Sequence, residues 1–250
     1  MQHSLLSRTF LPVAACILLS LLSAAQAAEG GLRLAQTRVI FNADNKNAAA
    51  VIKNNSQQVY LIKAGVMNTP ESNNPALPAA PFMVTPPMYR LEKESRGTAL
   101  VVRNGTAQLP ADRESVFWLS FLAIPAVSKN GETPDNMTSA QVSVGIRNVI
   151  KLFYRPAGLS PSFEQAQEKL TFRREGRSVS VNNPTPYYLT LAALSFNGKD
   201  VSLQDHNPMI APFSSAVFPA EGAVSQAQWA VITDYGDIGQ IHTAAVSAGE

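Results

Sequence analysis

Residues 141–154 read QVSVGIRNVIKLFY and form the longest strand that the sequence predicts. At about 3.3 Å per residue, an extended segment of this length spans roughly 40 Å, whereas strands usually have about five or six residues. Side chains alternate along a strand, so three aliphatic residues share one face: Val142, Val144 and Ile146. The opposite face carries Ser143, Gly145, Arg147 and Lys151. The segment therefore predicts a long strand with one aliphatic face and one mostly polar face.

The aliphatic face of this segment has two interpretations. An edge strand with an apolar face is a template for pairing with another chain, and proteins usually protect such edges with charge or proline. Only Arg147 interrupts this one. Alternatively, the three aliphatic side chains face the core of their own domain. The pattern alone favours the second interpretation.

In the rest of the chain, short segments of alternating apolar and polar residues are separated by clusters of Asn, Gly and Pro. This pattern is typical of β-sandwiches. Before the long strand, the expected strands are 32–41, 48–53, 58–67, 82–85, 98–102 and 116–124. After it, they are 169–173, 178–181, 187–194, 209–218, 228–233 and 238–246. The polar, turn-rich residues 128–140 predict a long loop before the long strand. The sequence therefore predicts an all-β protein with two immunoglobulin-sized sandwiches.

The break between the two sandwiches is expected at residues 155–158, which read RPAG. Proline cannot donate a hydrogen bond to a β-ladder and glycine weakens one. We therefore place one domain at 28–155, including the long strand, and a second at 156–250.

The N-terminus has the features of a secretory signal peptide. A positive charge at Arg8 precedes an apolar run, and Ala25-Gln26-Ala27 offers the small residues that a signal peptidase requires. Cleavage after Ala27 would remove residues 1–27 and with them the only cysteine, Cys16. A membrane anchor is the alternative, but the apolar run is shorter than the roughly 20 residues of a spanning helix. A lipoprotein signal at Cys16 is a further alternative, although the apolar run continues through it.

Composition and motifs argue against several function classes. The formal net charge of the whole chain is +2, with no run of like charges that would suggest a nucleic-acid partner. Only His206 and His242 remain after cleavage, without cysteine, so thiol chemistry and most zinc sites are excluded. A serine hydrolase that uses one of these histidines is the enzyme alternative, but isolated histidines near turns are usually solvated. We expect no catalytic residues, no metal and no cofactor.

Six blocks of sequence resemble the PapD-like periplasmic pilus chaperones, in the order of that family and across both domains. The most specific is LPADRESVFW at 109–118, which continues to AIP at 123–125. The others are TRVIF at 37–41, TPP at 85–87 with RL at 90–91, KLFYRP at 151–156, NPTPYY at 183–188 and DYG at 234–236.

The resemblance implies two immunoglobulin-like domains in a boomerang arrangement with a cleft between them. In this family, the last strand of the first domain completes a pilus subunit that lacks its own final strand, a mode of strand addition known as donor-strand complementation. It also implies a periplasmic location, delivery of subunits to an outer-membrane usher, and no use of ATP.

Carried over residue by residue, the resemblance assigns three sets of positions. Arg38 and Lys151 match the basic residues that bind the terminal carboxylate of the subunit, which suits the donors of Arg and Lys. Val142, Val144 and Ile146 match the aliphatic side chains that fill the groove of the subunit. Glu114, Arg155 and Asp234 match a buried ionic network that fixes the angle between the domains.

Some positions depart from the family pattern. Ser120 and Phe121 stand where the signature usually has asparagine and an aliphatic residue, Gly145 interrupts the donor strand, and the second domain lacks a cysteine pair. These departures leave the identity of the subunit and the length class of the loop open. They also leave open whether free molecules cap their strands as homodimers. An exported immunoglobulin-like adhesion module is the alternative function.

Overall fold

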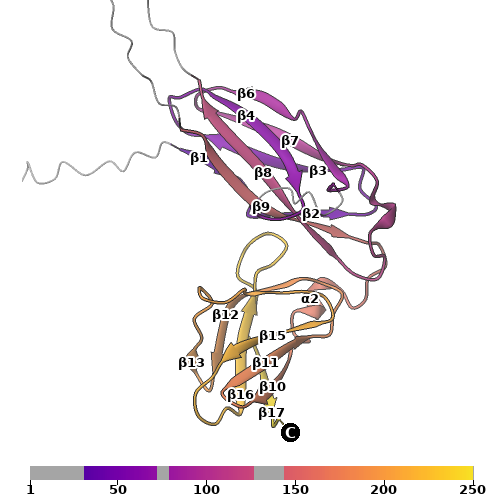
Figure 1. The fold of residues 1–250 in the computed structure, drawn as a ribbon, viewed down its shortest axis with the longest axis vertical. Helices are drawn as coiled ribbons and strands as arrows, with labels where there is room; N and C mark the ends of the chain where they lie inside the picture. Colours follow the sequence, from indigo (N-terminus) through magenta and orange to yellow (C-terminus); the bar gives the residue numbers. More distant parts are fainter. Residues whose placement is uncertain (1–30, 72–78, 127–143, 250) are drawn as a thin grey trace, which may run out of the picture.

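The computed structural model describes residues 31–71, 79–126 and 144–249, which form two β-rich lobes joined end to end (Figure 1). The expected signal peptide, the whole of the expected loop at 128–140 and Val142 lie outside the described residues. Each lobe has its own core of buried apolar side chains.

The described part of the first lobe contains nine strands and one short 3-10 helix. They are β1 (Leu32–Leu34), β2 (Arg38–Asn42), β3 (Asn47–Asn54), β4 (Tyr60–Met67), β5 (Phe82–Thr85), β6 (Met88–Leu91), β7 (Ser95–Arg103), η1 (Thr106–Gln108), β8 (Ser115–Pro125) and β9 (Ile146–Arg155). A four-stranded sheet has the order β1-β3-β7-β5, and a five-stranded sheet has the order β2-β9-β8-β4-β6.

Alternation of side chains explains how these two sheets enclose a core. Along β8, Phe117, Leu119, Phe121 and Ala123 are buried at every second position, as expected for a strand with one face on the core. Aromatic rings fill the end of the core near the second lobe, where Phe82 lies 5.3 Å from both Phe41 and Phe117 between ring centroids.

The second lobe contains the short helix α2 and eight strands. They are α2 (Phe163–Ala166), β10 (Thr171–Glu175), β11 (Ser178–Asn183), β12 (Leu189–Phe196), β13 (Lys199–Asp200), β14 (Met209–Ile210), β15 (Ser214–Pro219), β16 (Gln226–Val231) and β17 (His242–Ser247). The strand order is β13-β12-β16-β17-β10-β11-β15, and β14 pairs with β12. Trp229 lies at the centre of this core, and its indole Nε1 donates a hydrogen bond to the carbonyl oxygen of Gln167 at 2.9 Å.

The expected all-β fold of two immunoglobulin-like sandwiches is confirmed, but three predicted strands need correction. The strand predicted at 32–41 is two strands, because the chain leaves one sheet after Leu34 and enters the other at Arg38. The strand predicted at 209–218 is also two strands, since Phe213 has a left-handed φ of 52° between them. Of the strand predicted at 141–154, residues 141–143 lie outside the described residues, Val144 and Gly145 are not in a strand, and β9 begins at Ile146.

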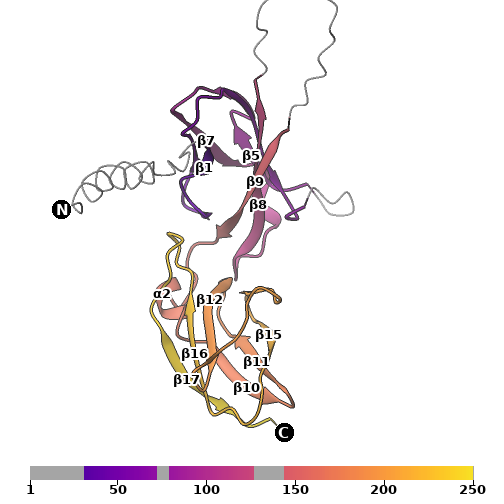
Figure 2. The same ribbon diagram turned by 90° about the vertical axis from the view of Figure 1, so that its left-hand side faces the viewer.

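The loop between β16 and β17 reaches from the second lobe to the first (Figure 1, Figure 2). Gly236 lies in this loop with a φ of 92°, and a Cβ atom there would collide with Oγ1 of Thr37 in the first lobe. Glycine is therefore required both by the backbone conformation and by the close approach of the two lobes.

Candidate functional site

One edge of β9 is only partly covered. On one side, β9 pairs with β8 from Ile146 to Tyr154. On the other side it pairs in parallel with β2, and this ladder runs only from Arg38 opposite Lys151 to Asn42 opposite Arg155. Among the described residues, the second edge of β9 therefore has no strand partner over residues 146–150.

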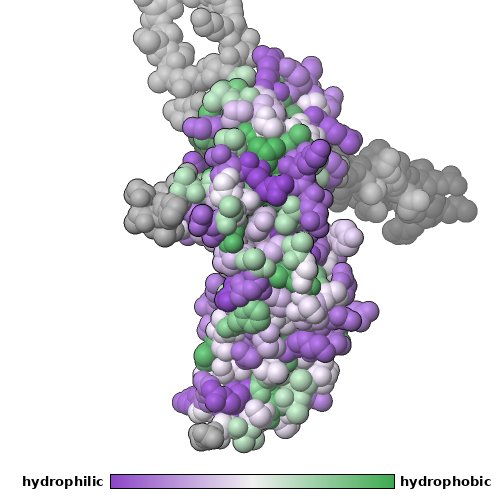
Figure 3. Space-filling view, turned by 90° about the vertical axis from the view of Figure 1, so that its right-hand side faces the viewer, coloured by the Kyte–Doolittle hydropathy of each residue, from purple (hydrophilic) through white to green (hydrophobic). Residues whose placement is uncertain are grey.

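The aliphatic residues that precede and begin β9 are exposed. The exposed fraction is 68% for Val144 and 52% for Ile146. Leu152 lies further along β9 on the same face as Ile146, and it is fully buried in the core. Exposed apolar patches are visible on both lobes among hydrophilic side chains (Figure 3).

Two basic side chains lie where the free edge of β9 meets the start of β2. Arg38 and Lys151 are register partners, so their side chains project from the same face of the sheet. Arg38 is only 7% exposed, and its Nη1 donates to the carbonyl oxygen of Ile232 at 3.3 Å. Its Nε is buried without a hydrogen-bond partner among the described residues. Such a group is costly to leave unpaired, so the position favours an added acceptor.

Burial weakens the charged form of both members of this pair. Burial lowers the pKa of Lys151, and the neighbouring charge of Arg38 lowers it further. Burial also lowers the pKa of Arg38, although Asp234 and Glu114 oppose this shift. An anion bound between the two side chains would reverse both effects. The pair is therefore suited to bind a carboxylate.

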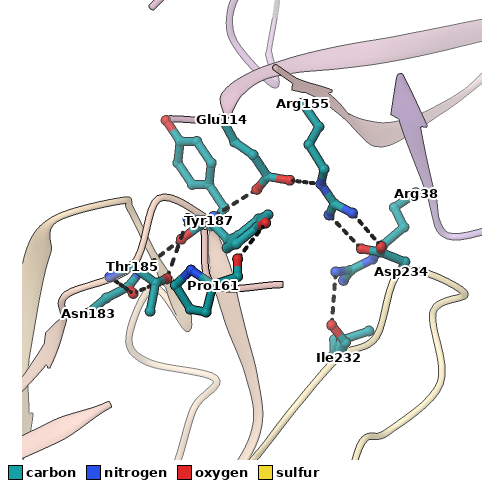
Figure 4. A network of polar contacts seen from close by, with 10 residues as sticks. Arg38, Glu114, Arg155, Pro161, Asn183, Thr185, Tyr187, Ile232 and Asp234 are labelled. Atoms are coloured by element: carbon teal, nitrogen blue, oxygen red, sulfur yellow. Dashed lines mark hydrogen bonds and ion pairs between the residues drawn. The ribbon is translucent and has the colours of Figure 1, made fainter. Parts of the chain in front are cut away.

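The predicted ionic network joins the lobes (Figure 4). Arg155 donates from Nε to Glu114 at 2.7 Å, and its two terminal nitrogens donate to Asp234 at 2.6 and 2.8 Å. Glu114 also accepts the backbone N–H of Tyr188 at 2.8 Å. Glu114 and Arg155 belong to the first lobe and Asp234 to the second, so the guanidinium is bonded to carboxylates on both sides of the junction.

Burial by itself shifts the pKa values of Glu114 and Arg155 in opposite directions. Burial raises the pKa of Glu114 and outweighs the attraction of Arg155. Burial alone would lower the pKa of Arg155, but hydrogen bonds and charges from Asp234 and Glu114 raise it overall. The guanidinium therefore stays charged, and it also lies over the rings of Phe163 and Tyr187, at 4.9 and 5.1 Å from their centroids.

The structure shows further contacts at the junction that sequence reasoning missed. Arg113 lies over the ring of Phe213 at 4.9 Å, so a cation–π contact joins the lobes beside the ionic network. Asn183 is fully buried, and its Nδ2 donates to the carbonyl oxygen of Tyr187 at 2.7 Å. A turn was foreseeable from the NPTP sequence at 183–186, because Asn and Pro favour turns. Nothing in the sequence pairs Arg113 with Phe213.

Other kinds of site are not seen in the part of the chain that the structure describes. There is no group of three or more His, Cys, Asp or Glu residues that could hold a metal ion. None of the described helices is long and apolar enough to cross a membrane.

The fold and this site define a class of protein: two immunoglobulin-like domains with a partly open strand edge that ends at a basic pair near their junction. Family models identify the particular family. "Pili and flagellar-assembly chaperone, PapD N-terminal domain" matches residues 31–160, and "Pili assembly chaperone PapD, C-terminal domain" matches residues 165–243. The chain belongs to the PapD family of pilus-assembly chaperones, which confirms the resemblance found in the sequence.

Relatives and solved structures agree with this assignment. The chain is 34% identical over 231 residues to the chaperone protein FimC of Escherichia coli K12, covering 91% of this chain and 90% of FimC. It is 35% identical over 206 residues to the chaperone protein HifB of Haemophilus influenzae, covering 80% and 82%. The solved structure of the E. coli chaperone DraB matches with a TM-score of 0.73 and 31% identity, covering 87% and 97%. A complex of the SafA pilin with the SafB chaperone of Salmonella enterica matches with a TM-score of 0.71 and 27% identity, covering 86% and 96%.

Proposed function

We propose that this protein is a periplasmic chaperone that binds pilus subunits by donor-strand complementation and delivers them to an outer-membrane usher. In this proposal residues 1–27 are a cleaved signal peptide, 28–155 form the donor domain and 156–250 form the second domain. The protein then needs no catalytic residue and no cofactor, because apolar burial and main-chain hydrogen bonds supply the binding energy. Named fimbrial chaperones among its relatives, and the pilin complex of SafB, support this function.

The observation that carries the proposal is that the free edge of β9 ends at the basic pair. β2 runs parallel to β9 and begins at Arg38, opposite Lys151. An added strand in line with β2 and running in the same direction would pair with residues 146–150 and end where β2 begins. Its C-terminal carboxylate would then reach Arg38 and Lys151. A polypeptide that ends in this way is therefore the ligand that the geometry favours.

The exposed side chains of the donor segment support the same ligand. Val144 and Ile146 are more than half exposed in the free chain, so they are available to fill an apolar groove. Val142 would extend this row, but it lies outside the described residues. In the absence of a subunit, two copies of the chain pairing through this edge would cover the same surface, which makes a self-capping homodimer part of the proposal.

Affinity purification from the native bacterium tests this function. A tagged full-length chain is isolated from the periplasm, and the proteins that co-purify are identified by mass spectrometry. We expect small secreted β-rich subunits with wild-type chain and with the control Arg33→Ala, which removes an exposed charge on β1. We expect Arg38→Ala to lose them. Equal recovery with Arg38→Ala, or recovery only of unrelated surface ligands, would contradict the proposal and favour an adhesion module.

A further inference from the structure

The outer face of the five-stranded sheet carries a hollow of about 210 Å³ that the family assignment does not explain. Its walls follow from the register of β9, β8 and β4, which places residues side by side in three rows across the sheet. The first row is Lys151, Trp118 and Met67. The second row, which we call the small row, is Val149, Ser120 and Gly65. The third row is Arg147, Leu122 and Lys63.

The hollow exists because the small row lies between two rows of large side chains. Gly65 has no side chain, and a Cβ atom built there meets no atom within 4 Å. Ser120 is short, and it lies opposite Gly65 in the ladder between β8 and β4. Met67 and Leu122 provide apolar walls, while Lys63 and Arg147 line the same hollow. Neither of these two basic residues forms an ion pair with another described residue.

The position of the hollow links it to the edge of β9. Val149, at one end of the small row, belongs to the part of β9 that has no partner on its second side. The row that contains Lys151 lies two residues further along the strand, about 7 Å away. A subunit that is paired with the edge and anchored at Lys151 would therefore lie beside Val149, at the end of the small row that is nearest to this edge.

We propose that the hollow receives one large apolar side chain of the bound pilus subunit, with an acidic residue of the subunit beside it at Lys63 and Arg147. This inference rests on the proposed function, and it adds a determinant of subunit choice. At about 30 Å³ per water molecule, the hollow holds several waters, which one large apolar side chain would displace. Lys63 and Arg147, which form no ion pair with another described residue, supply the complementary charge for the acidic neighbour. Because the hollow depends on Gly65 and Ser120, a chaperone with larger residues there would reject the same subunit.

Photo-crosslinking in the native bacterium tests the occupant of the hollow. A benzophenone amino acid replaces Leu61, which is exposed on β4 two residues before Lys63, Ile146 at the donor edge, or Arg33 as a control on the other sheet, each in the full chain. We expect the positions of Leu61 and Ile146 to crosslink to the same pilus subunit and the position of Arg33 to give no such product. Crosslinking of the subunit only at Ile146, or of an usher or a second copy at Leu61, would overturn the hollow proposal while the proposed function stands. No subunit at either position would overturn both.

Filling the hollow gives an independent measurement. Gly65→Val adds a side chain where the free chain has space, so its unfolding midpoint in denaturant should stay near that of wild type. We expect the amount of co-purifying subunit to fall by about 10-fold, because the subunit could no longer bury one large apolar side chain in the hollow. Gly31→Val is the matched control, since a Cβ at Gly31 also meets no atom within 4 Å but lies away from the hollow. Equal recovery of subunit with Gly65→Val and Gly31→Val would overturn the proposal.

Discussion

Lys151 illustrates how burial would prepare a single residue for the proposed binding of a carboxylate. It lies beside Arg38 and forms no ion pair with a described carboxylate, so its charge is poorly compensated among the described residues. Truncating one partner of a desolvated charge pair typically costs about 2 to 5 kcal/mol of complex stability. We therefore expect Lys151→Ala to fold normally yet lose at least tenfold in affinity for the subunit, measured by titration of the purified chain. Wild-type affinity in this variant would place the carboxylate elsewhere.

The lowered pKa of Lys151 also predicts a pH dependence of binding. A carboxylate binds the charged ammonium, whereas the free chain releases that proton below the ordinary lysine pKa of about 10.4. Affinity should therefore be constant near neutral pH and fall as the pH rises through this lowered pKa. Lys151→Arg keeps its charge throughout that range, so its affinity should not fall. The measurement is the dissociation constant of the subunit against pH, and a parallel decline in both proteins would refute the assignment.

At the scale of elements, the alternation of apolar residues predicts most strands because burial on one face leaves a period-two pattern. The strand at 82–85 is confirmed with its exact bounds, and most others are confirmed within about three residues. β6 was missed because MYRL at 88–91 is short and does not alternate clearly, and α2 because four residues are too few for helical periodicity. The break at Phe213 was also hidden, since glycine or asparagine normally marks a left-handed residue.

A stability measurement at Ile146 distinguishes the two interpretations of the aliphatic face, namely packing in the core of its own domain or pairing with another chain. If Ile146 faced its own core, truncation would destabilise the free chain by about 1.5 to 3 kcal/mol. Ile146 is half exposed, so we expect Ile146→Ser to unfold in denaturant at nearly the wild-type midpoint while it captures much less subunit. Gly145 offers no side chain that would compete for the opposite face. Leu152→Ser is the matched control on β9, and it should lower the midpoint strongly because Leu152 is fully buried.

A reversed result would refute the donor role. A large drop in the midpoint of Ile146→Ser, with unchanged capture per folded molecule, would return this strand to the core.

At the scale of the whole molecule, the site depends on contacts that no local pattern contains. Asp234 is 79 residues from Arg155 in the sequence, and only the resemblance to a family suggested that they meet. Periodicity reports which face of a strand is buried, but it carries no information about which loop of a second domain lies against it. For the same reason, the contact between Arg113 and Phe213 and the hollow at Gly65 could be found only in the structure.

The last prediction compares a buried ion pair at the junction between the lobes with an exposed ion pair of equal length in the second lobe. The N···O distance is 2.6 Å both for Arg155 with Asp234 and for Lys199 with Glu221. The side chains of the first pair are 15% and 25% exposed, whereas those of the second are 74% and 76% exposed. Removing one partner of a buried pair costs about 3 to 5 kcal/mol, and an exposed pair contributes about 0 to 1 kcal/mol.

We therefore expect Asp234→Ala to lower the melting temperature of the free chain clearly and Glu221→Ala to leave it nearly unchanged. Because Arg155 would then donate side-chain hydrogen bonds only to Glu114 in its own lobe, the lobes should also sample a wider range of angles. Small-angle scattering would record this as a broader distribution of interatomic distances for Asp234→Ala alone. If both variants melt and scatter like the wild type, the network does not hold the lobes together, and other contacts across the junction, such as the cation–π contact of Arg113 and the loop at Gly236, set their angle instead.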